Sequence, residues 1–154
     1  MDLDQDKLQK LRELDDVFRK LRRLINAEYN RFNAHGLGMT EGKMVIILAE
    51  HGPQKASAMA EWLRITSGAV TGISDRLIDL GYVERSRSEF DRRIVMLSVT
   101  DEGRKLVDFI MEMRERIMFK LYDGFEIDDI EKATDIFIRM SDNLDQKNET
   151  PEES

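Results

Sequence analysis

The sequence contains no cysteine, two histidines and two prolines among its 154 residues. Without cysteine the chain can form no disulfide, hold no metal through thiolates and sense no oxidant through a thiol, and two isolated histidines are a poor basis for a transition-metal site. Few prolines leave long helices uninterrupted. The composition, with 36% charged and 41% hydrophobic residues, is typical of a helix-rich single domain with large solvated faces.

The chain also lacks a long apolar run. No window approaches the roughly 18 uninterrupted apolar residues of a membrane helix, and the start, MDLDQDKLQK, is acidic and polar where a secretion signal is basic and then apolar. We therefore expect a cytoplasmic protein with no membrane partner. The sequence shows no nucleophile beside a base, no phosphate-binding loop and no metal-ligand spacing, so we expect no enzyme and no cofactor.

A net charge of −7 argues at first sight against a nucleic-acid partner, because lysine and arginine drive phosphate binding. The distribution matters more than the sum. From Gln54 to Arg104, eight Lys and Arg balance eight Asp and Glu, so the acid excess lies outside this stretch. Between Arg85 and Arg93, four arginines accompany two acids. The charge pattern therefore permits DNA binding without predicting it.

Apolar residues at alternating steps of three and four predict long amphipathic helices in both terminal parts of the chain. The first spans about residues 8–32, and its apolar stripe is wide enough to meet several neighbours. Two more helices follow in the C-terminal third, one starting at Thr100 and one carrying Ile130 to Leu144. We expect residues 145–154 to be a flexible tail.

Three short helices and one hairpin are predicted between the long helices. Thr40 is expected to cap the first, KASAMAEWLRI forms the second, and the third begins at Thr66 or Ser67 and ends at Gly81. A period of two then predicts strands in YVERSRS and RIVMLSVT, the only hairpin that we expect. The predicted fold class is mainly α with a small β-hairpin wing, a winged helix-turn-helix lobe at residues 40–100 within one domain at residues 1–154.

The third short helix and the hairpin suit duplex DNA. An α-helix fits the major groove, and a helix-turn-helix points the first residues of its second helix at base edges. The small, polar first turn from Thr66 to Ala69 lets the backbone approach closely, and its unpaired amides can receive a phosphate. Gly72 costs the helix about 1 kcal/mol relative to Ala, which suggests the close approach of a partner. An arginine of the hairpin can enter the narrow minor groove.

The segment ITSGAVTGISDRLIDLGYVERSRSEFDRRIVMLSVTDEGRKL resembles the recognition helix and wing of the MarR family of bacterial and archaeal regulators. The family's D-x-R wing motif is Asp91, Arg92 and Arg93 here, followed by Val99-Thr100 and Glu102-Gly103. MAEWLRITSGAVTGISDRLIDLGYVER supplies the LAE-x-L…V-x-x-x-x-DRL-x-x-x-G-x-V-x-R skeleton. These specific motifs cover about a quarter to a third of the chain. The order of one long helix before and two after is similar to the family's dimerisation region.

The resemblance implies a DNA-binding transcriptional regulator, a repressor that acts as a homodimer on a pseudo-palindromic operator of double-stranded DNA. It implies dimerisation helices at residues 5–35 and 101–144. Asp91 is expected to orient an arginine through a charge-assisted hydrogen bond. The candidate DNA contacts are Thr66, Ser67, Gly68, Thr71, Ser74, Arg76, Arg87, Arg92 and Arg93.

Members of the family often bind small aromatic or phenolic compounds between the dimerisation helices and the DNA-binding lobe. The resemblance therefore makes Tyr29, His35 and Trp62 candidates for an effector pocket, with release of DNA as the consequence of binding. Simpler roles stay open for two of them: Trp62 can be a core residue, and His35 beside two glycines can be an exposed helix end.

Other interpretations also stay open for the charged residues. Asp75 and Arg76 can pair with neighbours on a solvated helix face, and the wing arginines can keep the hairpin soluble. No Arg or Lys lies between Thr66 and Asp75, so guanine recognition by a bidentate arginine is poorly supported, and hydroxyls, backbone amides and DNA shape would have to specify the sequence. The acidic balance keeps open a different class of function, a winged helix used as a protein-interaction module.

Overall fold

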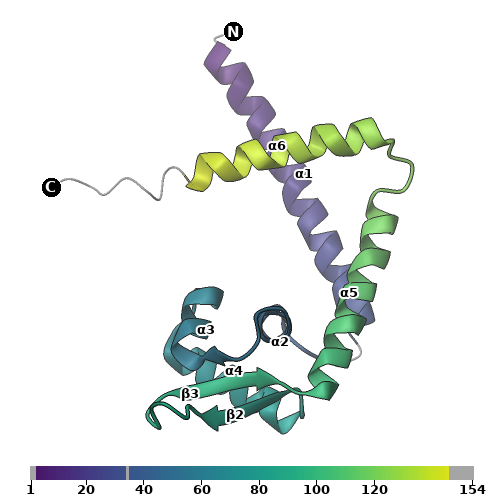
Figure 1. Cartoon of the computed structure of the whole chain (residues 1–154). Coiled ribbons are helices and arrows are strands. Elements are labelled where there is room, and N and C mark those ends of the chain that lie inside the picture. The colour runs from purple at the N-terminus through teal and green to yellow at the C-terminus, as the bar shows by residue number, and fades with distance from the viewer. Residues whose placement is uncertain (1–2, 34, 146–154) are drawn as a thin grey trace, which may run out of the picture. The chain divides into compact units, whose positions relative to one another are not determined.

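Nine helices and strands make up the part of the chain that the structure, a computed structural model, describes: residues 3–33 and 35–145. The predicted tail at 145–154 lies outside the described residues except for Asp145. The elements are α1 (Leu3–Phe32), α2 (Met39–His51), β1 (Gln54–Lys55), α3 (Ala56–Leu63), α4 (Ser67–Asp79), β2 (Val83–Arg87), β3 (Val95–Val99), α5 (Asp101–Leu121) and α6 (Ile127–Asp145) (Figure 1). The predicted fold class, mainly α with a small wing, is confirmed.

The chain divides into two units, Met1–Ile117 and Met118–Ser154. The first contains the winged helix-turn-helix, and the second contains α6. None of the helices in the described ranges has the length and apolar character that crossing a bilayer requires.

The sheet has the strand order β1-β3-β2, and both pairings are antiparallel. β2 and β3 form the predicted hairpin, with Arg85 opposite Leu97. On its other edge β3 pairs with β1, where Gln54 lies opposite Leu97. The sequence-based expectation of a hairpin alone was wrong on this point, because a strand of two residues is too short to show a period of two.

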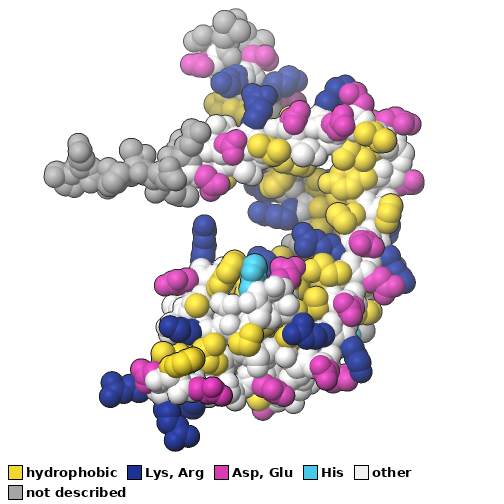
Figure 2. Space-filling model, viewed as in Figure 1, with side chains coloured by type: hydrophobic (Ala, Val, Ile, Leu, Met, Phe, Trp, Pro, Cys, Tyr) yellow, Lys and Arg dark blue, Asp and Glu magenta, His cyan; other side chains and the backbone are white. Residues whose placement is uncertain are grey.

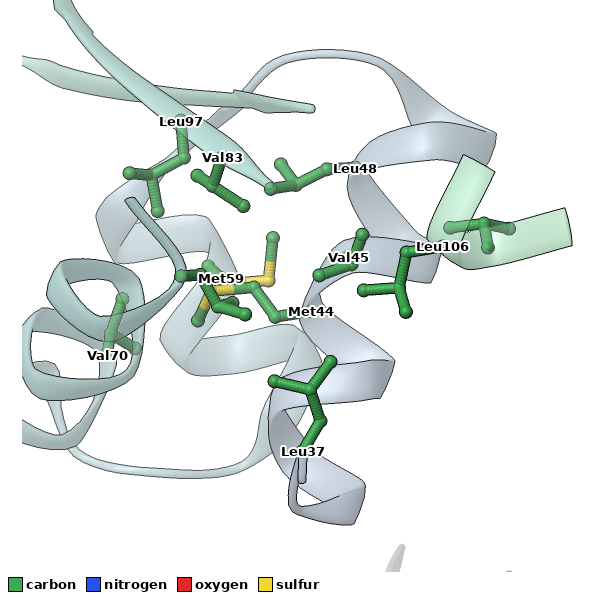
Figure 3. Packing of buried hydrophobic residues seen from close by; sticks show 11 residues of the cluster. Leu37, Met44, Val45, Leu48, Met59, Val70, Val83, Leu97 and Leu106 are labelled. Carbon is green, nitrogen blue, oxygen red and sulfur yellow. The ribbon is translucent and has the colours of Figure 1, made fainter. Parts of the chain in front are cut away.

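The hydrophobic core lies where α2, α3 and α4 meet the sheet (Figure 3). Met44, Val45 and Leu48 form the α2 side of this core, and none of them is exposed. Leu97, on the central strand, is also fully buried, and Leu106 extends the core to α5. The core therefore fixes α4 and the hairpin in one lobe. The other buried members are Leu37, Met59, Val70, Leu77, Val83 and Val107.

α2 begins one residue before the predicted cap. Gly38 occupies the N-cap position, and the Glu41 carboxylate accepts its backbone N–H at 2.7 Å. Thr40 therefore lies inside the helix, and the expectation that it caps the helix was wrong. A glutamate at the third helical position can close this arrangement without a hydroxyl at the N-cap.

The N-terminus of α5 packs tightly against the end of the hairpin. Thr100 Oγ1 donates to the Gly81 carbonyl at 2.6 Å and accepts the Gly103 N–H at 3.0 Å. A Cβ at Gly103 would lie 2.2 Å from the Tyr82 carbonyl oxygen and 2.6 Å from Val99 Cγ2. Glycine is therefore required here by the close approach of two backbones.

Candidate nucleic-acid interface

The first turn of α4 is capped and open to solvent. Thr66 is the N-cap residue, and its Oγ1 accepts the Ala69 N–H at 3.2 Å. Thr66, Ser67 and Gly68 are exposed. Because the first amides of a helix have no intrahelical acceptor, the Ser67 and Gly68 N–H groups are available to an anion placed at this end.

α4 has an apolar inner side and a polar outer side. Val70, Leu77 and the neighbouring Ile73 face the core. The outer side carries small side chains, and a Cβ added at Gly68 or Gly72 would meet no atom within 4 Å. Packing within the subunit therefore explains neither glycine. The exposed residues of α4 up to its tenth position are Ser67, Gly68, Thr71, Gly72, Asp75 and Arg76.

Ser74 does not lie on the outer side, which corrects its assignment as a DNA contact. Its side of α4 is the buried stripe, and only 2% of the residue is exposed. Its hydroxyl donates to the Val70 carbonyl at 2.7 Å and accepts a hydrogen bond from Arg85 Nη2 at 3.2 Å. These contacts give Ser74 a role inside the lobe.

Arg76 braces α4 against the start of α2. Its Nη1 lies 2.5 Å from Glu41 Oε1, and its Nη2 donates to the Gly36 carbonyl at 3.1 Å. Half of the Arg76 side chain is exposed, whereas the Glu41 side chain is 12% exposed. Arg76 was considered both as a DNA contact and as a partner of neighbouring residues, and the structure has it paired with Glu41 and Gly36.

Arg85 joins the hairpin to α4, a role that the sequence analysis missed. Its Nη2 lies 2.5 Å from Asp75 Oδ1 and also reaches Ser74. Asp75 therefore has the structural role that was left open for it. The contact orients the hairpin relative to α4. Local sequence patterns could not predict it, because Asp75 lies on a helix and Arg85 lies ten residues later on a strand.

The loop of the wing is shaped by short-range hydrogen bonds. The Asp91 carboxylate accepts the backbone N–H of Arg93 at 3.0 Å, and the Asp91 carbonyl accepts the N–H of Ile94 at 3.0 Å. Arg87 Nη1 approaches the Arg92 carbonyl at 3.5 Å. Asp91 was expected to orient an arginine through a charge-assisted hydrogen bond; in the described residues its carboxylate instead accepts the backbone N–H of Arg93 and holds the turn.

The guanidinium groups of Arg92 and Arg93 project into solvent. Both residues are exposed, and within the described residues neither side chain has an ion-pair or hydrogen-bond partner. Figure 2 shows Lys and Arg side chains standing out from the lobe at the end that carries the β2–β3 loop. The loop between β2 and β3 thus presents two guanidinium groups without an ion-pair partner, together with the carboxylates of Glu89 and Asp91.

A cavity of about 310 Å³ lies in the same unit, away from α4. Its walls come from the end of α1, the segment before α2, α2 itself and α5. Tyr29 and His35, two of the three candidates for an effector pocket, line it together with Lys43 and Arg114. His35 shares a hydrogen bond of 3.1 Å with the Tyr82 hydroxyl, and its ring packs edge-on against Phe109 at 5.0 Å. The other lining residues are Asn30, Asn33, Leu37, Gly38, Met39, Gly42, Ile46, Leu106, Ile110 and Met113.

Trp62 does not line this cavity, so it does not share a pocket with Tyr29 and His35; it borders a separate surface pocket with Glu61 and Arg64. It lies on α3, where its ring stacks on His51 with centroids 4.7 Å apart, and it is 50% exposed. Trp62 is not a buried core residue either, because half of it is exposed. α3 contributes no residue to the cavity. No pattern in the sequence indicates that α3 packs away from the end of α1.

Together, the two short helices α3 and α4, the three-stranded sheet and the arginine-bearing loop define a winged helix-turn-helix of the kind that binds DNA. The sequence model of the MarR family matches residues 37–95. The HTH-type transcriptional regulator YpoP of Bacillus subtilis (strain 168) is 30% identical over 139 residues, which cover 90% of this chain and 96% of YpoP. The chain therefore belongs to the MarR family and is a transcriptional regulator with a DNA-binding fold.

Solved structures agree with this assignment. FabT from Streptococcus pneumoniae, solved in complex with DNA, is 25% identical, with a TM-score of 0.73 over 90% of this chain and 98% of FabT. BpsR from Bordetella bronchiseptica, whose DNA binding is regulated by 6-hydroxynicotinic acid, is 20% identical, with a TM-score of 0.68 over 83% of this chain and 92% of BpsR. The likeness to BpsR concerns the fold alone.

Proposed function

We propose that this protein is a repressor that binds a pseudo-palindromic operator as a homodimer. Each subunit would place α4 in a major groove, and the two helices would lie about one helical turn apart, roughly 34 Å along the DNA. The observation that carries the proposal is the pairing of a polar, glycine-containing outer side of α4 with a rigid wing whose Arg92 and Arg93 have no partner among the described residues.

The proposed contacts on α4 belong to its first two turns. The Ser67 and Gly68 amides would receive a phosphate, and the hydroxyls of Thr66, Ser67 and Thr71 would reach the backbone or base edges. Ser74 and Arg76 are left out of this set, because the first is buried and the second is paired with Glu41. Arg92 or Arg93 would enter the minor groove, where the potential is most negative, with Arg87 near the phosphates.

Dimerisation is proposed from the apolar side chains that a single chain leaves exposed. On α1, Leu11, Leu14 and Val17 are 51%, 58% and 63% exposed. No residue of α6 is buried, although Ile136 and Phe137 lie on an apolar stripe. Exposed apolar stripes of this kind mark interfaces, and a second copy of the same chain would bury each of them in a self-complementary way.

The cavity is proposed as the site of a small aromatic or phenolic effector. Its lining is mostly apolar and aromatic, which suits a ring. Lys43 and Arg114 are exposed at its edge and have no ion-pair partner among the described residues, so an acidic group on the ring would be favoured. Binding releases DNA only if the effector has a higher affinity for the subunit arrangement that does not fit the operator.

The decisive experiment is selection of bound duplexes from a random pool, followed by titration of the recovered duplex at several salt concentrations. We expect inverted repeats and a steep salt dependence. Substitution of both arginines, R92A with R93A, should weaken binding and reduce the slope of log K against log salt by about 0.9 for each lost phosphate contact. If wild-type protein enriches no sequence and binds no duplex, the function would instead be that of a protein-interaction module.

Repression has its own test. Transcription in vitro from a promoter that contains the selected site should fall when the protein is added, because a dimer covering that site excludes the polymerase. An increase would make the protein an activator.

A further inference from the structure

Phe90 stands at the tip of the wing with 99% of its surface exposed. Most other exposed apolar side chains lie on α1, α5 and α6, where an amphipathic stripe accounts for them. Phe90 lies in the loop between β2 and β3 and buries almost nothing within its own subunit. The stability of the fold therefore gives no reason for an aromatic residue at this position.

The loop holds Phe90 in a defined position. Its backbone N–H donates to Ser88 Oγ at 3.3 Å, and the Ser88 N–H donates to the Ile94 carbonyl at 3.0 Å. The next residue, Asp91, accepts the Arg93 N–H with its carboxylate and the Ile94 N–H with its carbonyl. A side chain with two rotatable bonds on a hydrogen-bonded turn loses little conformational entropy when it binds.

The surroundings of Phe90 determine what kind of partner fits it. Arg92 and Arg93 follow within three residues, and their guanidinium groups have no partner among the described residues. Glu89 and Asp91 flank Phe90 in the chain, and the Asp91 carboxylate is engaged by the backbone N–H of Arg93. The two guanidinium groups without a partner therefore favour an anionic partner, which must also offer an apolar surface to the ring. The ion pair between Arg85 and Asp75 fixes β2, the strand that leads into this loop, against α4, so the nearest such partner is the duplex that α4 would bind.

We infer that Phe90 is a specificity-determining residue that packs against the sugar wall of the minor groove and wedges at a base step beside the wing arginine. The inference rests on the proposed function. Apolar side chains that enter the minor groove partly unstack a base step, and the cost is lowest at flexible pyrimidine–purine steps. Phe90 would thus favour operators with a TA or CA/TG step under the wing.

This role of Phe90 would supply sequence discrimination that the side chains of α4 provide only weakly. Between Thr66 and Asp75 there is no Arg or Lys for bidentate recognition of guanine, so the major-groove contacts discriminate weakly. A residue that senses deformability adds discrimination at positions that α4 does not touch. The selected sequences should therefore carry information outside the two half-sites.

The first test compares duplexes selected from a random pool by the wild-type protein and by F90A. The wild-type pool should be enriched in a pyrimidine–purine step flanking each half-site, and the F90A pool should keep the half-sites and lose that step. On the selected duplex, F90A should bind about tenfold more weakly. F90L, which keeps an apolar side chain, should bind within about threefold of the wild type.

The salt dependence separates Phe90 from its neighbours. Phenylalanine releases no counterion, so F90A should leave the slope of log K against log salt unchanged, whereas the double variant R92A/R93A should lower it. If F90A binds the selected duplex as tightly as the wild type and selects the same flanks, the inference is wrong while the proposed function stands. If the wild type binds no duplex, both fail.

A second measurement follows the ring itself. In the variant F90W/W62F, the single tryptophan at the tip should shift its emission to shorter wavelength when the selected duplex is added, because it leaves water. Vesicles of phosphatidylglycerol with phosphatidylcholine test the other anionic partner with an apolar surface. A blue shift with vesicles and none with duplex would overturn the inference.

Discussion

Arg76 and Glu41 form an ion pair that connects α4 to the first turn of α2, with Nη1 and Oε1 2.5 Å apart. The same guanidinium holds the Gly36 carbonyl, and the same carboxylate caps Gly38. Two neighbours of these contacts, Leu37 and Gly38, also line the cavity. The segment that borders the cavity is therefore the one on which α4 is braced, and it would link an effector bound in the cavity to α4.

We predict that R76A lowers the free energy of unfolding by about 1 to 2 kcal/mol. The loss leaves the mostly buried Glu41 carboxylate without its partner, and the half-exposed position of the arginine keeps the effect below that of a buried pair. Urea denaturation at fixed protein concentration measures it. E41Q is the matched variant, because glutamine keeps the cap on Gly38 and removes the charge.

The R76A variant also tests how Arg76 affects DNA binding. If it acts as a brace, R76A should weaken binding to the selected duplex without changing the slope of log K against log salt. A slope reduced by about 0.9 would mean that Arg76 contacts a phosphate and that our exclusion of this residue from the interface is wrong.

We predict opposite effects of G72A on stability and on DNA binding. Alanine should stabilise α4 by about 1 kcal/mol, because the added Cβ meets nothing within 4 Å and the unfolded chain loses freedom. The Cβ would then stand on the side of α4 that we propose to approach the duplex, and affinity should fall by about tenfold. Thermal unfolding and fluorescence anisotropy give the two values.

G42A is the control for this prediction. Gly42 lies inside α2, and a Cβ there would make only an ordinary contact of 3.8 Å with Ile110 Cδ1. The G42A variant should gain stability in the same way as G72A, and its affinity for DNA should equal that of the wild type. Tighter DNA binding by G72A would contradict the proposed approach of DNA to this face.

Periodicity predicted the long helices, the hairpin and the third short helix because each is a local pattern that burial imposes on the sequence. The buried position of Ser74 was present in the same pattern: it is four residues after Val70 and three before Leu77, so it shares their stripe. Its hydroxyl suggested an exposed position, whereas the helical period places it on the buried side of α4, where the structure has it. Polar residues can occupy a buried stripe when, like Ser74, they bond the preceding turn.

Contacts between distant segments could not be predicted in this way. Glu41 and Arg76 are 35 residues apart, and His35 and Tyr82 are 47 apart. No local rule pairs such residues, since their approach depends on how α2, α4 and the sheet share one core. The separation of Trp62 from Tyr29 and His35 could not be predicted for the same reason: the elements that surround a cavity are known only once the helices are packed.

We predict that G103A destabilises the lobe by about 1 to 3 kcal/mol or prevents folding. The new Cβ would overlap the Tyr82 carbonyl oxygen, which is backbone and cannot rotate away. T100S, which retains the hydroxyl that bonds Gly81 and Gly103, should change stability little by comparison. Calorimetry on both variants tests the claim, and a G103A protein as stable as the wild type would show that α5 can move away from the hairpin.

The last prediction concerns the chemistry of the cavity. Because Lys43 and Arg114 border a mostly apolar lining, hydroxybenzoates should raise the melting temperature more than the corresponding neutral amides. At a free concentration of one hundred times Kd the stabilisation should be about 2.7 kcal/mol. K43A should remove the preference for the acid, whereas W62A should keep it because Trp62 lies outside the cavity. Equal shifts for acids and amides would mean that the two cations do not select the ligand, and the apolar walls alone would then determine what binds.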